Sequence, residues 1–228
     1  MAQKQYNSSY YVGQPGRREP SIIEDYLKPN IATYGIIVAC VIVYVWEMID
    51  LDSLTLMAMR PDRPWPWMFV TSIFMHSWVD PFHLLFNMLM LFMFGVTLER
   101  MVGSWRYLGL FLAAGIAGNI GYVLFCLVTG STDPAIGASG AIYGVFACLA
   151  ILAPQIRVYL FFFIPLRIFH AFILYAAIDI IFLNTNDSIA HAAHLAGALA
   201  GVAFAAYIKR LIRKRQAYAV SYEFDAGY

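Results

Sequence analysis

Charged residues are scarce in this chain. Asp, Glu, Lys and Arg together make up 13% of its 228 residues, while 61% are hydrophobic, against about 25% charged and 45–50% apolar in soluble domains. This balance excludes a soluble globular protein and predicts a multi-pass protein of the cell membrane, surrounded by the lipid bilayer. The net charge is only +1, so no basic surface suggests a nucleic-acid partner.

Cysteine is also rare. Cys40, Cys126 and Cys148 all fall inside apolar runs, and their spacing fits neither a disulfide framework nor a zinc site. We expect all three to be small buried residues. Residues 1–20 lack the apolar core of a cleaved signal peptide and are predicted to form a flexible cytoplasmic tail.

Six long apolar runs are present, most of them near the ~20 residues that a bilayer requires. They predict an all-α membrane protein, a bundle of six transmembrane helices within one membrane domain at residues 21–215. Residues 216–228 show no periodicity and are predicted to be a mobile cytoplasmic tail. The expected helices cover about residues 31–48, 81–98, 107–128, 139–154, 168–183 and 189–208.

Two connections are unusual in composition. Residues 51–80 join the first two helices and contain Trp65, Trp67 and Trp78; this aromatic content predicts an outer loop lying at the membrane interface. Residues 156–165 are β-branched and aromatic but too short to cross the bilayer. We expect them to form a loop of extended character.

The basic residues predict the orientation in the membrane. If the N-terminus lies in the cytoplasm, 13 of the 15 Lys and Arg residues fall on the inner side, and only Arg60 and Arg63 lie outside. The positive-inside rule therefore predicts that both termini are cytoplasmic. The loop before Ser139 and the turn before the sixth helix then face outward.

Strongly polar side chains cost several kcal/mol inside a bilayer, so each marks a candidate functional site. Ser139 opens the fourth predicted helix, where free backbone N–H groups favour negative charge. His83 and Asn87 lie four residues apart on one face of the second helix, and His194 lies about 7 Å into the sixth. We expect all four at the same depth of the outer leaflet.

Glycines accompany both the serine and the histidine. Gly197 and Gly201 share the helix face of the histidine, and the fourth helix carries Gly140 and Gly144. Small residues at this spacing let helix backbones approach closely in lipid. We expect the fourth and sixth helices to pack through these glycines and so bring serine and histidine together, although helix packing alone also explains the pattern.

Other chemistries fit the sequence less well. His191 and His194 have the i, i+3 spacing of metal ligands, but no His-Glu-x-x-His motif and no intramembrane carboxylate placed as a third ligand is evident. We therefore expect no metal and no other cofactor. A paired-aspartate mechanism is excluded because Asp179 stands alone in the membrane. We expect Asp179 and His170 to be structural or interfacial, Asn119 to form an interhelical hydrogen bond, and His76 to line a water entrance or face solvent.

The assembled residues resemble the rhomboid family of intramembrane serine proteases, over about residues 67–201. Four motifs carry the resemblance, in the order and on the helices that the family has them. They are Gly137-Ala138-Ser139-Gly140, His194 with Gly197 and Gly201, His83 with Asn87, and Glu99-Arg100 with Gly103-Ser104. The chain departs from the family at Trp67-Met68, where a Trp-Arg pair is common, and in a longer span between His76 and His83.

The resemblance implies a role for each of these residues. Ser139 would be the nucleophile and His194 the general base and acid. No acidic third member is evident in the sequence itself, so we expect a dyad. The oxyanion would be stabilised by His83, Asn87 and the backbone N–H of Ser139. Tyr143 would be the aromatic residue on which the catalytic imidazole packs. Structural roles would fall to Glu99, Gly137, Gly140, Gly144, Gly197 and Gly201.

The expected function is that of a serine endopeptidase which cleaves the transmembrane segments of membrane protein substrates through a Ser139–His194 dyad. Two alternatives remain. A non-proteolytic relative would bind membrane clients and hand them on, but such relatives usually lack the serine or the histidine. A channel or transporter would carry polar residues along a path through both leaflets, whereas here they gather in the outer half.

Overall fold

The computed structural model describes residues 30–50, 52, 56–160, 163–185 and 190–225. Within these ranges the protein is mainly helical and has four helices that are long and apolar enough to cross a membrane. The chain forms two compact units. Residues 29–205 make up the first, and the second combines residues 1–28 with 206–228. The predicted N-terminal tail and most of the turn before the sixth helix lie outside the described residues.

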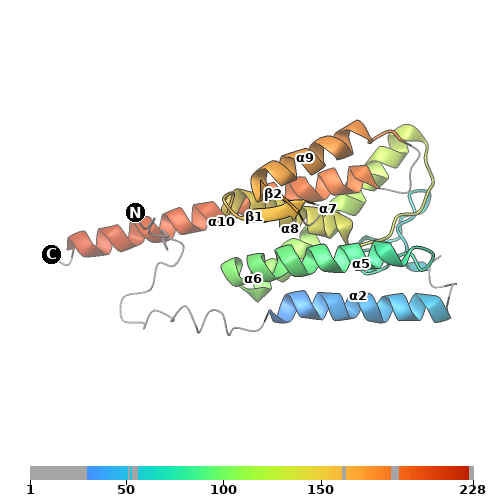
Figure 1. Cartoon of the computed structure of the whole chain (residues 1–228), viewed down its shortest axis with the longest axis horizontal. Helices are drawn as coiled ribbons and strands as arrows, with labels where there is room; N and C mark the ends of the chain where they lie inside the picture. Colours follow the sequence, from blue (N-terminus) through green and yellow to red (C-terminus); the bar gives the residue numbers. More distant parts are fainter. Residues whose placement is uncertain (1–29, 51, 53–55, 161–162, 186–189, 226–228) are drawn as a thin grey trace. The chain divides into compact units, whose positions relative to one another are not determined.

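The helices follow the predicted apolar runs to within a few residues at most of their ends (Figure 1). Two of them, α8 and α9, have 14 residues each and are shorter than a full crossing. The elements are α2 (Ile31–Ile49), α4 (Met68–Thr71), α5 (Pro81–Met90), the π-helical segment η1 (Leu91–Gly95), α6 (Val96–Val102), α7 (Ser104–Thr129), α8 (Ser139–Leu152), β1 (Arg157–Leu160), β2 (Ile164–Arg167), α9 (Ile168–Ile181) and α10 (His191–Asp225).

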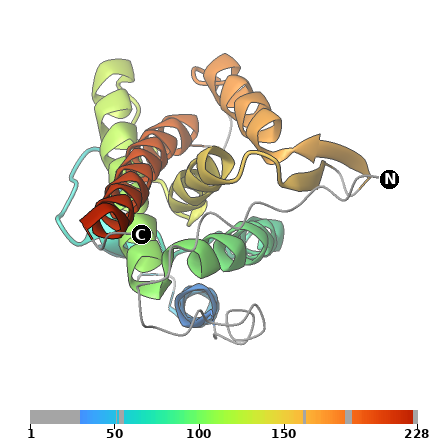
Figure 2. The same cartoon turned by 90° about the vertical axis from the view of Figure 1, so that its left-hand side faces the viewer.

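Helix α8 is the centre of the first unit. Figure 2 shows it surrounded by α5, α7, α9 and α10, and eleven of its 14 residues are buried. It is apolar all round, as expected of a helix with neighbours on every side. The outer helices instead expose large apolar side chains, for example Ile49 on α2, Val128 on α7 and Ile181 on α9. Exposed apolar surface on this scale indicates contact with lipid.

The second membrane helix is one continuous unit of α5, η1 and α6. Asp80 caps its start by accepting a hydrogen bond from the Phe82 N–H at 3.1 Å, and Pro81 occupies the first turn, where its missing N–H does no harm. In its middle the five residues of η1 widen the helix into a π turn. The ring of Phe94 in this turn stacks on Phe146 of α8, with 4.6 Å between ring centroids.

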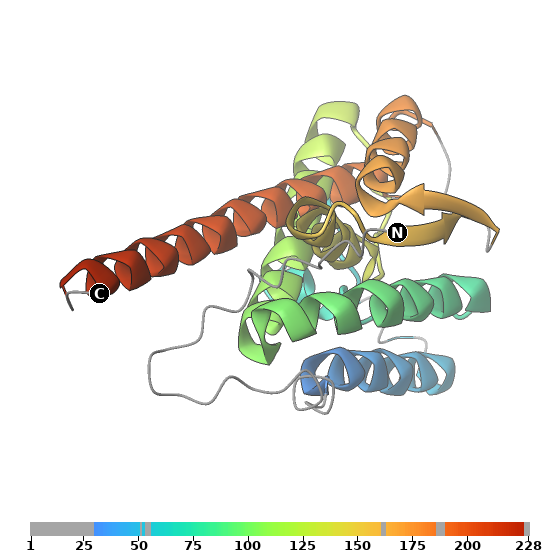
Figure 3. The same ribbon diagram turned by 60° about the vertical axis from the view of Figure 1, so that its left-hand side comes forward.

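Glu99 of α6 joins the second membrane helix to the first. Helix α2 lies alongside α5 and α6 in both Figure 1 and Figure 3. The buried Glu99 carboxylate accepts hydrogen bonds from the N–H groups of Ala32 (3.0 Å) and Thr33 (2.8 Å), and from the hydroxyls of Thr33 (2.6 Å) and Ser104 (2.6 Å). These bonds use N–H groups of the first turn of α2 that have no partner within their own helix. The geometry is that of a structural anchor.

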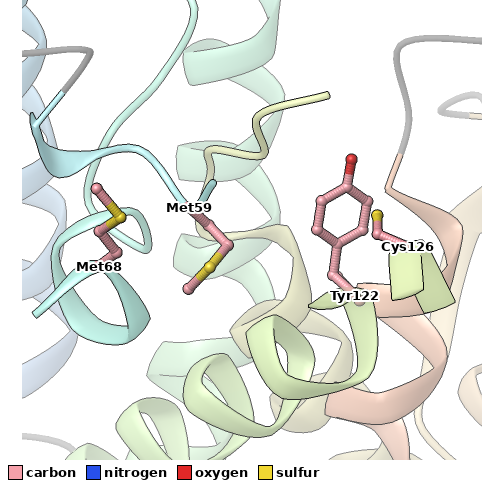
Figure 4. Close-up of a cluster of buried hydrophobic side chains, with 5 residues drawn as sticks. Met59, Met68, Tyr122 and Cys126 are labelled. Carbon is pink, nitrogen blue, oxygen red and sulfur yellow. The ribbon is translucent and has the colours of Figure 1, made fainter. Parts of the chain in front are cut away.

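The long connection between α2 and α5 is attached to the loop that precedes α8. Met59 and Ala135 form an isolated antiparallel bridge, with N–H to carbonyl distances of 3.0 and 2.9 Å. Figure 4 shows Met59 and Met68 from this connection beside Tyr122 and Cys126 of α7, in one cluster of buried side chains. This packing fixes the loop that leads into Ser139.

Two parts of the fold have more regular structure than the sequence predicted. The expected extended loop contains a paired antiparallel hairpin, in which Arg157 faces Arg167 and Val158 faces Leu166. The predicted mobile tail is helical as far as Asp225, because α10 continues through residues 216–225. The residues there include good helix formers such as Ala, Gln and Glu, which extend a helix without a hydrophobic period. The three cysteines are buried and free, as predicted.

Candidate active site

Ser139 and His194 meet at the start of two neighbouring helices. Ser139 is the first residue of α8, and His194 lies in the first turn of α10. The distance from His194 Nε2 to Ser139 Oγ is 2.8 Å, a hydrogen-bond length for a hydroxyl donating to an imidazole. Histidine 194 is buried. The two residues are 55 positions apart in the chain, so only the fold brings them together.

Glycine contacts between α8 and α10 allow this approach. A Cβ built at Gly197 would collide with the carbonyl oxygen of Gly140, and one built at Gly201 would collide with that of Gly144. The backbones of the two helices therefore touch directly. Gly197 is three residues after His194, so this close packing also sets the height and rotation of the histidine relative to Ser139.

Tyr143 supports the imidazole from α8. Its ring stacks on that of His194, with 4.2 Å between centroids and 10° between ring planes. Tyr143 lies one turn after Ser139, so the same helix that presents the hydroxyl also presents the surface on which the imidazole rests. Offset stacking of this kind contributes about 0.5–1.5 kcal/mol beyond apolar burial.

Asp179 contacts the other side of the same imidazole. This buried carboxylate of α9 has its Oδ1 atom 3.0 Å from His194 Nδ1 and 2.6 Å from His191 Nδ1. The expectation that no intramembrane carboxylate accompanies the two histidines is therefore wrong. An ionised carboxylate only accepts hydrogen bonds, so both Nδ1 atoms carry the proton and His194 Nε2 is free to accept from Ser139.

The same three side chains have the composition of a metal site. Their ligand atoms lie within 4.8 Å of one another. Tetrahedral zinc ligands at about 2.0–2.1 Å from the metal would lie roughly 3.3 Å apart, whereas the two separations from Asp179 Oδ1 are 2.6 and 3.0 Å. Those are hydrogen-bond lengths, so the arrangement fits a hydrogen-bonded network better than a metal centre.

His83 of α5 lies close to Gly137, two residues before Ser139. Its Nδ1 lies 3.4 Å from the backbone N–H of Ser77 and accepts from it, which leaves the proton on Nε2. That Nε2 points at Gly137: a Cβ built there would lie 2.8 Å from it and 3.9 Å from Ser139 Oγ. Gly137 also has a φ of 122°, which strains other residues, so glycine is required twice over.

Asn87 and the start of α8 complete this side of the site. Asn87 is buried and donates its side-chain N–H to the His83 carbonyl oxygen at 2.7 Å. Ala138 precedes Ser139 and supplies no capping side chain. The first N–H groups of α8 are therefore not used by a side-chain cap. A role for Asn87 and the Ser139 N–H in stabilising an oxyanion remains a prediction.

His76 is buried, contrary to the expectation that it lines a water entrance or faces solvent. Its backbone N–H donates to Glu47 Oε2 at 3.2 Å and its Nδ1 lies 3.2 Å from the Phe74 carbonyl oxygen. The ring packs against His83, 5.2 Å between centroids, and its Nε2 lies 3.5 Å from the Ala138 N–H. His76 thus supports the two segments that flank Ser139.

The burial of His76 predicts acid-sensitive stability. Burial, aided by the nearby His83, lowers the His76 pKa from 6.5 to about 3. In the unfolded chain His76 binds a proton below about pH 6.5, whereas in the folded protein it does so only below about pH 3. The free energy of unfolding therefore falls as the pH drops through that window.

We expect His76→Gln to show a shallower fall of Tm between pH 6.5 and 4 than the wild type, measured in detergent micelles. The same substitution at the exposed His170 should leave the slope unchanged; equal slopes in all three proteins would contradict the expectation.

The remaining polar residues lie away from Ser139. Asn119 of α7 donates to the Phe69 carbonyl oxygen and to Ser72 Oγ, both at 2.9 Å, which joins α7 to α4 and the residue after it. The exposed His170 contacts only the Phe169 ring among the described ring pairs. Sequence reasoning missed the partnership of Asp179 with His194. The available signal was its position at the outer end of an apolar helix, the end at which His194 was expected.

The geometry is suited to acyl transfer. A serine hydroxyl hydrogen-bonds to an imidazole, and the imidazole hydrogen-bonds to a carboxylate, which is the arrangement that such a reaction needs. A family model described as the rhomboid domain matches residues 63–211, more than half of the chain. This chain belongs to the rhomboid family. The four sequence motifs of this rhomboid all lie within the matched range.

Relatives of this rhomboid include bacterial and mitochondrial proteins. It is 31% identical to "Rhomboid protein 1, mitochondrial" of Saccharomyces cerevisiae over 64% of the chain and 43% of that protein. It is 42% identical to "Rhomboid protease GluP" of Bacillus subtilis over 38% of the chain and 16% of that protein. It is 33% identical to the human "Presenilin-associated rhomboid-like protein, mitochondrial" over 59% of the chain and 36% of that protein. The chain thus spans less than half the length of each of these relatives.

Proposed function

We propose that this rhomboid is an intramembrane serine endopeptidase that cleaves transmembrane segments of other membrane proteins. The observation that carries the proposal is the 2.8 Å hydrogen bond between Ser139 Oγ and His194 Nε2. A serine hydroxyl is a weak nucleophile unless a base is positioned to remove its proton. Here the base is held on three sides, by Tyr143, Asp179 and the glycine contacts of α10 with α8.

The reaction follows from these positions. His194 Nε2 removes the proton of Ser139 as Oγ bonds to the carbonyl carbon of the scissile peptide, and the carbonyl oxygen becomes an oxyanion. His194 then gives that proton to the amine nitrogen as the C–N bond breaks, which leaves an acyl-enzyme. A water molecule repeats the sequence: His194 takes its proton, the hydroxyl oxygen bonds to the acyl carbon, and the proton returns to Ser139 Oγ as the acid leaves.

The oxyanion is assigned to the side of Ser139 that faces α5. The proposed donors are His83 Nε2–H, the side-chain amide of Asn87 and the Ser139 backbone N–H. Preorganised donors of this kind stabilise charge that develops only in the transition state, and removing one typically costs about 10²- to 10³-fold in kcat.

The proposed setting is a single membrane domain of residues 21–215 in the cell membrane. Six helices would span or enter the bilayer, with both termini in the cytoplasm and residues 51–80 at the outer interface. The distribution of Lys and Arg supports this orientation, as do the exposed tryptophans Trp65, Trp67 and Trp78. Water would then reach Ser139 from the outer face.

Non-proteolytic client binding is the second candidate, favoured by relatives whose names claim no protease activity. The experiment that separates the two uses wild-type protein in liposomes with a model transmembrane substrate. We expect cleavage, and stoichiometric labelling of Ser139 by a serine-directed phosphonate, located by mass spectrometry of the labelled peptide. Substrate binding without either cleavage or labelling would overturn the proposal in favour of client binding.

A further inference from the structure

Asp179 is a carboxylate in an otherwise apolar helix. The sequence of α9 is IFHAFILYAAIDII, and the only other polar side chains in it are those of His170 and Tyr175. The Asp179 side chain is 3% exposed. An ionised carboxylate at such a site is strongly unfavourable unless it is paired and hydrogen-bonded. The Asp179 carboxylate therefore requires hydrogen-bond donors that stabilise its negative charge.

The partners are two histidines on one turn of α10. His191 and His194 are three residues apart and both direct Nδ1 at the same oxygen, Asp179 Oδ1, at 2.6 and 3.0 Å. Three residues along a helix bring side chains onto one face, so the start of α10 encloses the carboxylate from two directions. His191 is also buried.

We propose that Asp179 is a positioning residue of this peptidase, and that His191 holds the Asp179 carboxylate against His194. The proposal rests on the function proposed above. Asp179 fixes His194 in the tautomer whose Nε2 accepts from Ser139, and it stabilises the imidazolium that forms when that proton is transferred. The site then acts as a series from Ser139 through His194 to Asp179, rather than as an isolated pair.

The charge changes explain why this contact accelerates the reaction. When Nε2 takes the Ser139 proton, His194 becomes a cation 3.0 Å from the anionic Asp179 Oδ1. The proton on Nδ1 stays on Nδ1, and Asp179 is not protonated at any step. In the resting enzyme His194 is neutral, so the attraction is stronger in the transition state than in the ground state. Only such a difference raises kcat.

His191 has a distinct role because it does not contact Ser139. A carboxylate bonded to a single imidazole could rotate about its own side-chain bonds. The 2.6 Å hydrogen bond from His191 Nδ1 restrains that rotation, as outer hydrogen bonds restrain the orienting group in other preorganised sites. Loss of His191 should therefore weaken the effect of Asp179 without removing it.

The first test compares Asp179→Asn with the wild type in the liposome assay. We expect kcat to fall by about 10²- to 10⁴-fold while KM changes little, because the amide keeps the size of the side chain but cannot hold the imidazolium. Phosphonate labelling of Ser139 should slow to a similar degree. Asp179→Glu retains the charge and should recover at least roughly tenfold in kcat over Asp179→Asn. Asp62→Asn, which changes an exposed carboxylate in the outer loop, should behave as wild type.

A second measurement does not depend on whether the Asp179 variants fold. His191→Gln leaves His194 as the one described imidazole bonded to Asp179. Its ¹⁵N-edited proton spectrum should show a single strongly downfield ring N–H assigned to His194 Nδ1, and kcat should fall less than in Asp179→Asn. Absence of that signal in a folded, active His191→Gln protein would overturn the proposal.

The outcomes separate this proposal from the proposed function. If the wild type neither cleaves nor labels, the function itself fails. If the wild type is active and Asp179→Asn keeps full kcat, only the role of Asp179 fails. If a chelator abolishes wild-type activity and zinc restores it, the three side chains hold a cation instead, and the positioning role is likewise overturned.

Discussion

Alanine at Ser139 is expected to lower cleavage of a transmembrane substrate by about 10⁴-fold or more, and alanine at His194 by a similar factor. In free energy this is at least about 5.5 kcal/mol of transition-state stabilisation. The two groups act as one unit, because the hydroxyl is nucleophilic only when the imidazole 2.8 Å away takes its proton. The double variant should therefore be no less active than either single variant.

Each substitution has a counterpart elsewhere in the chain. Ser131→Ala removes a hydroxyl from the loop before α8 that bonds to Asp133 at 3.0 Å, and His170→Ala removes an exposed imidazole. Both should cleave at the wild-type rate in the same liposomes, and all variants should unfold near the wild-type temperature. Multiplicative losses in the double variant would show that Ser139 and His194 act independently, and would contradict the assigned mechanism.

Valine at Gly201 is expected to give the largest loss of stability, about 3 kcal/mol or more. A Cβ there collides with the Gly144 carbonyl oxygen and lies 2.8 Å from both the carbonyl carbon and Cα of Gly144. These are backbone atoms of a buried helix, so the clash cannot be relieved by turning a flexible side chain. Helix α10 would have to move away from α8 and carry His194 with it.

The measurement is thermal unfolding in micelles together with the rate of phosphonate labelling. Gly35→Val is the matched control, because Gly35 also lies in a membrane helix but has no atom within 4 Å of its built Cβ. It should unfold and label like the wild type. A Gly201→Val protein with wild-type stability and labelling would show that α8 and α10 do not pack through these glycines.

The helices of this rhomboid could be predicted from the sequence because each depends on a local pattern. The apolar run at residues 107–128 defined α7, and the Gly197 and Gly201 spacing indicated which face of α10 packs closely. Pro81 after Asp80 marked the start of α5, since both residues favour a first turn. Ser139 and His194 were likewise found from their depth and their neighbouring glycines.

Other features depend on contacts between segments far apart in the chain. The sequence places Asp179 at the helix end where His194 was expected, but it does not show that the two side chains meet, because that contact is set by how α9 packs against α10. The burial of His76 follows from the route of the loop between α4 and α5, where apolar residues such as Ile73 and Met75 alternate with polar ones and no helical or strand period shows which side chains point inward. The extended character of residues 156–165 was predicted, but the pairing of β1 with β2 was not, because two four-residue strands give little period-2 signal.

The wide turn of η1 has a consequence for how the second membrane helix serves two neighbours. An added residue in one turn rotates everything before it relative to everything after it by roughly 100°. The half that carries His83 points toward Gly137, and the half that carries Glu99 points toward the start of α2. Each half can be aligned to its own partner without disturbing the other. The π-helical turn therefore allows the end that carries His83 and the end that carries Glu99 to be oriented independently within one continuous helix.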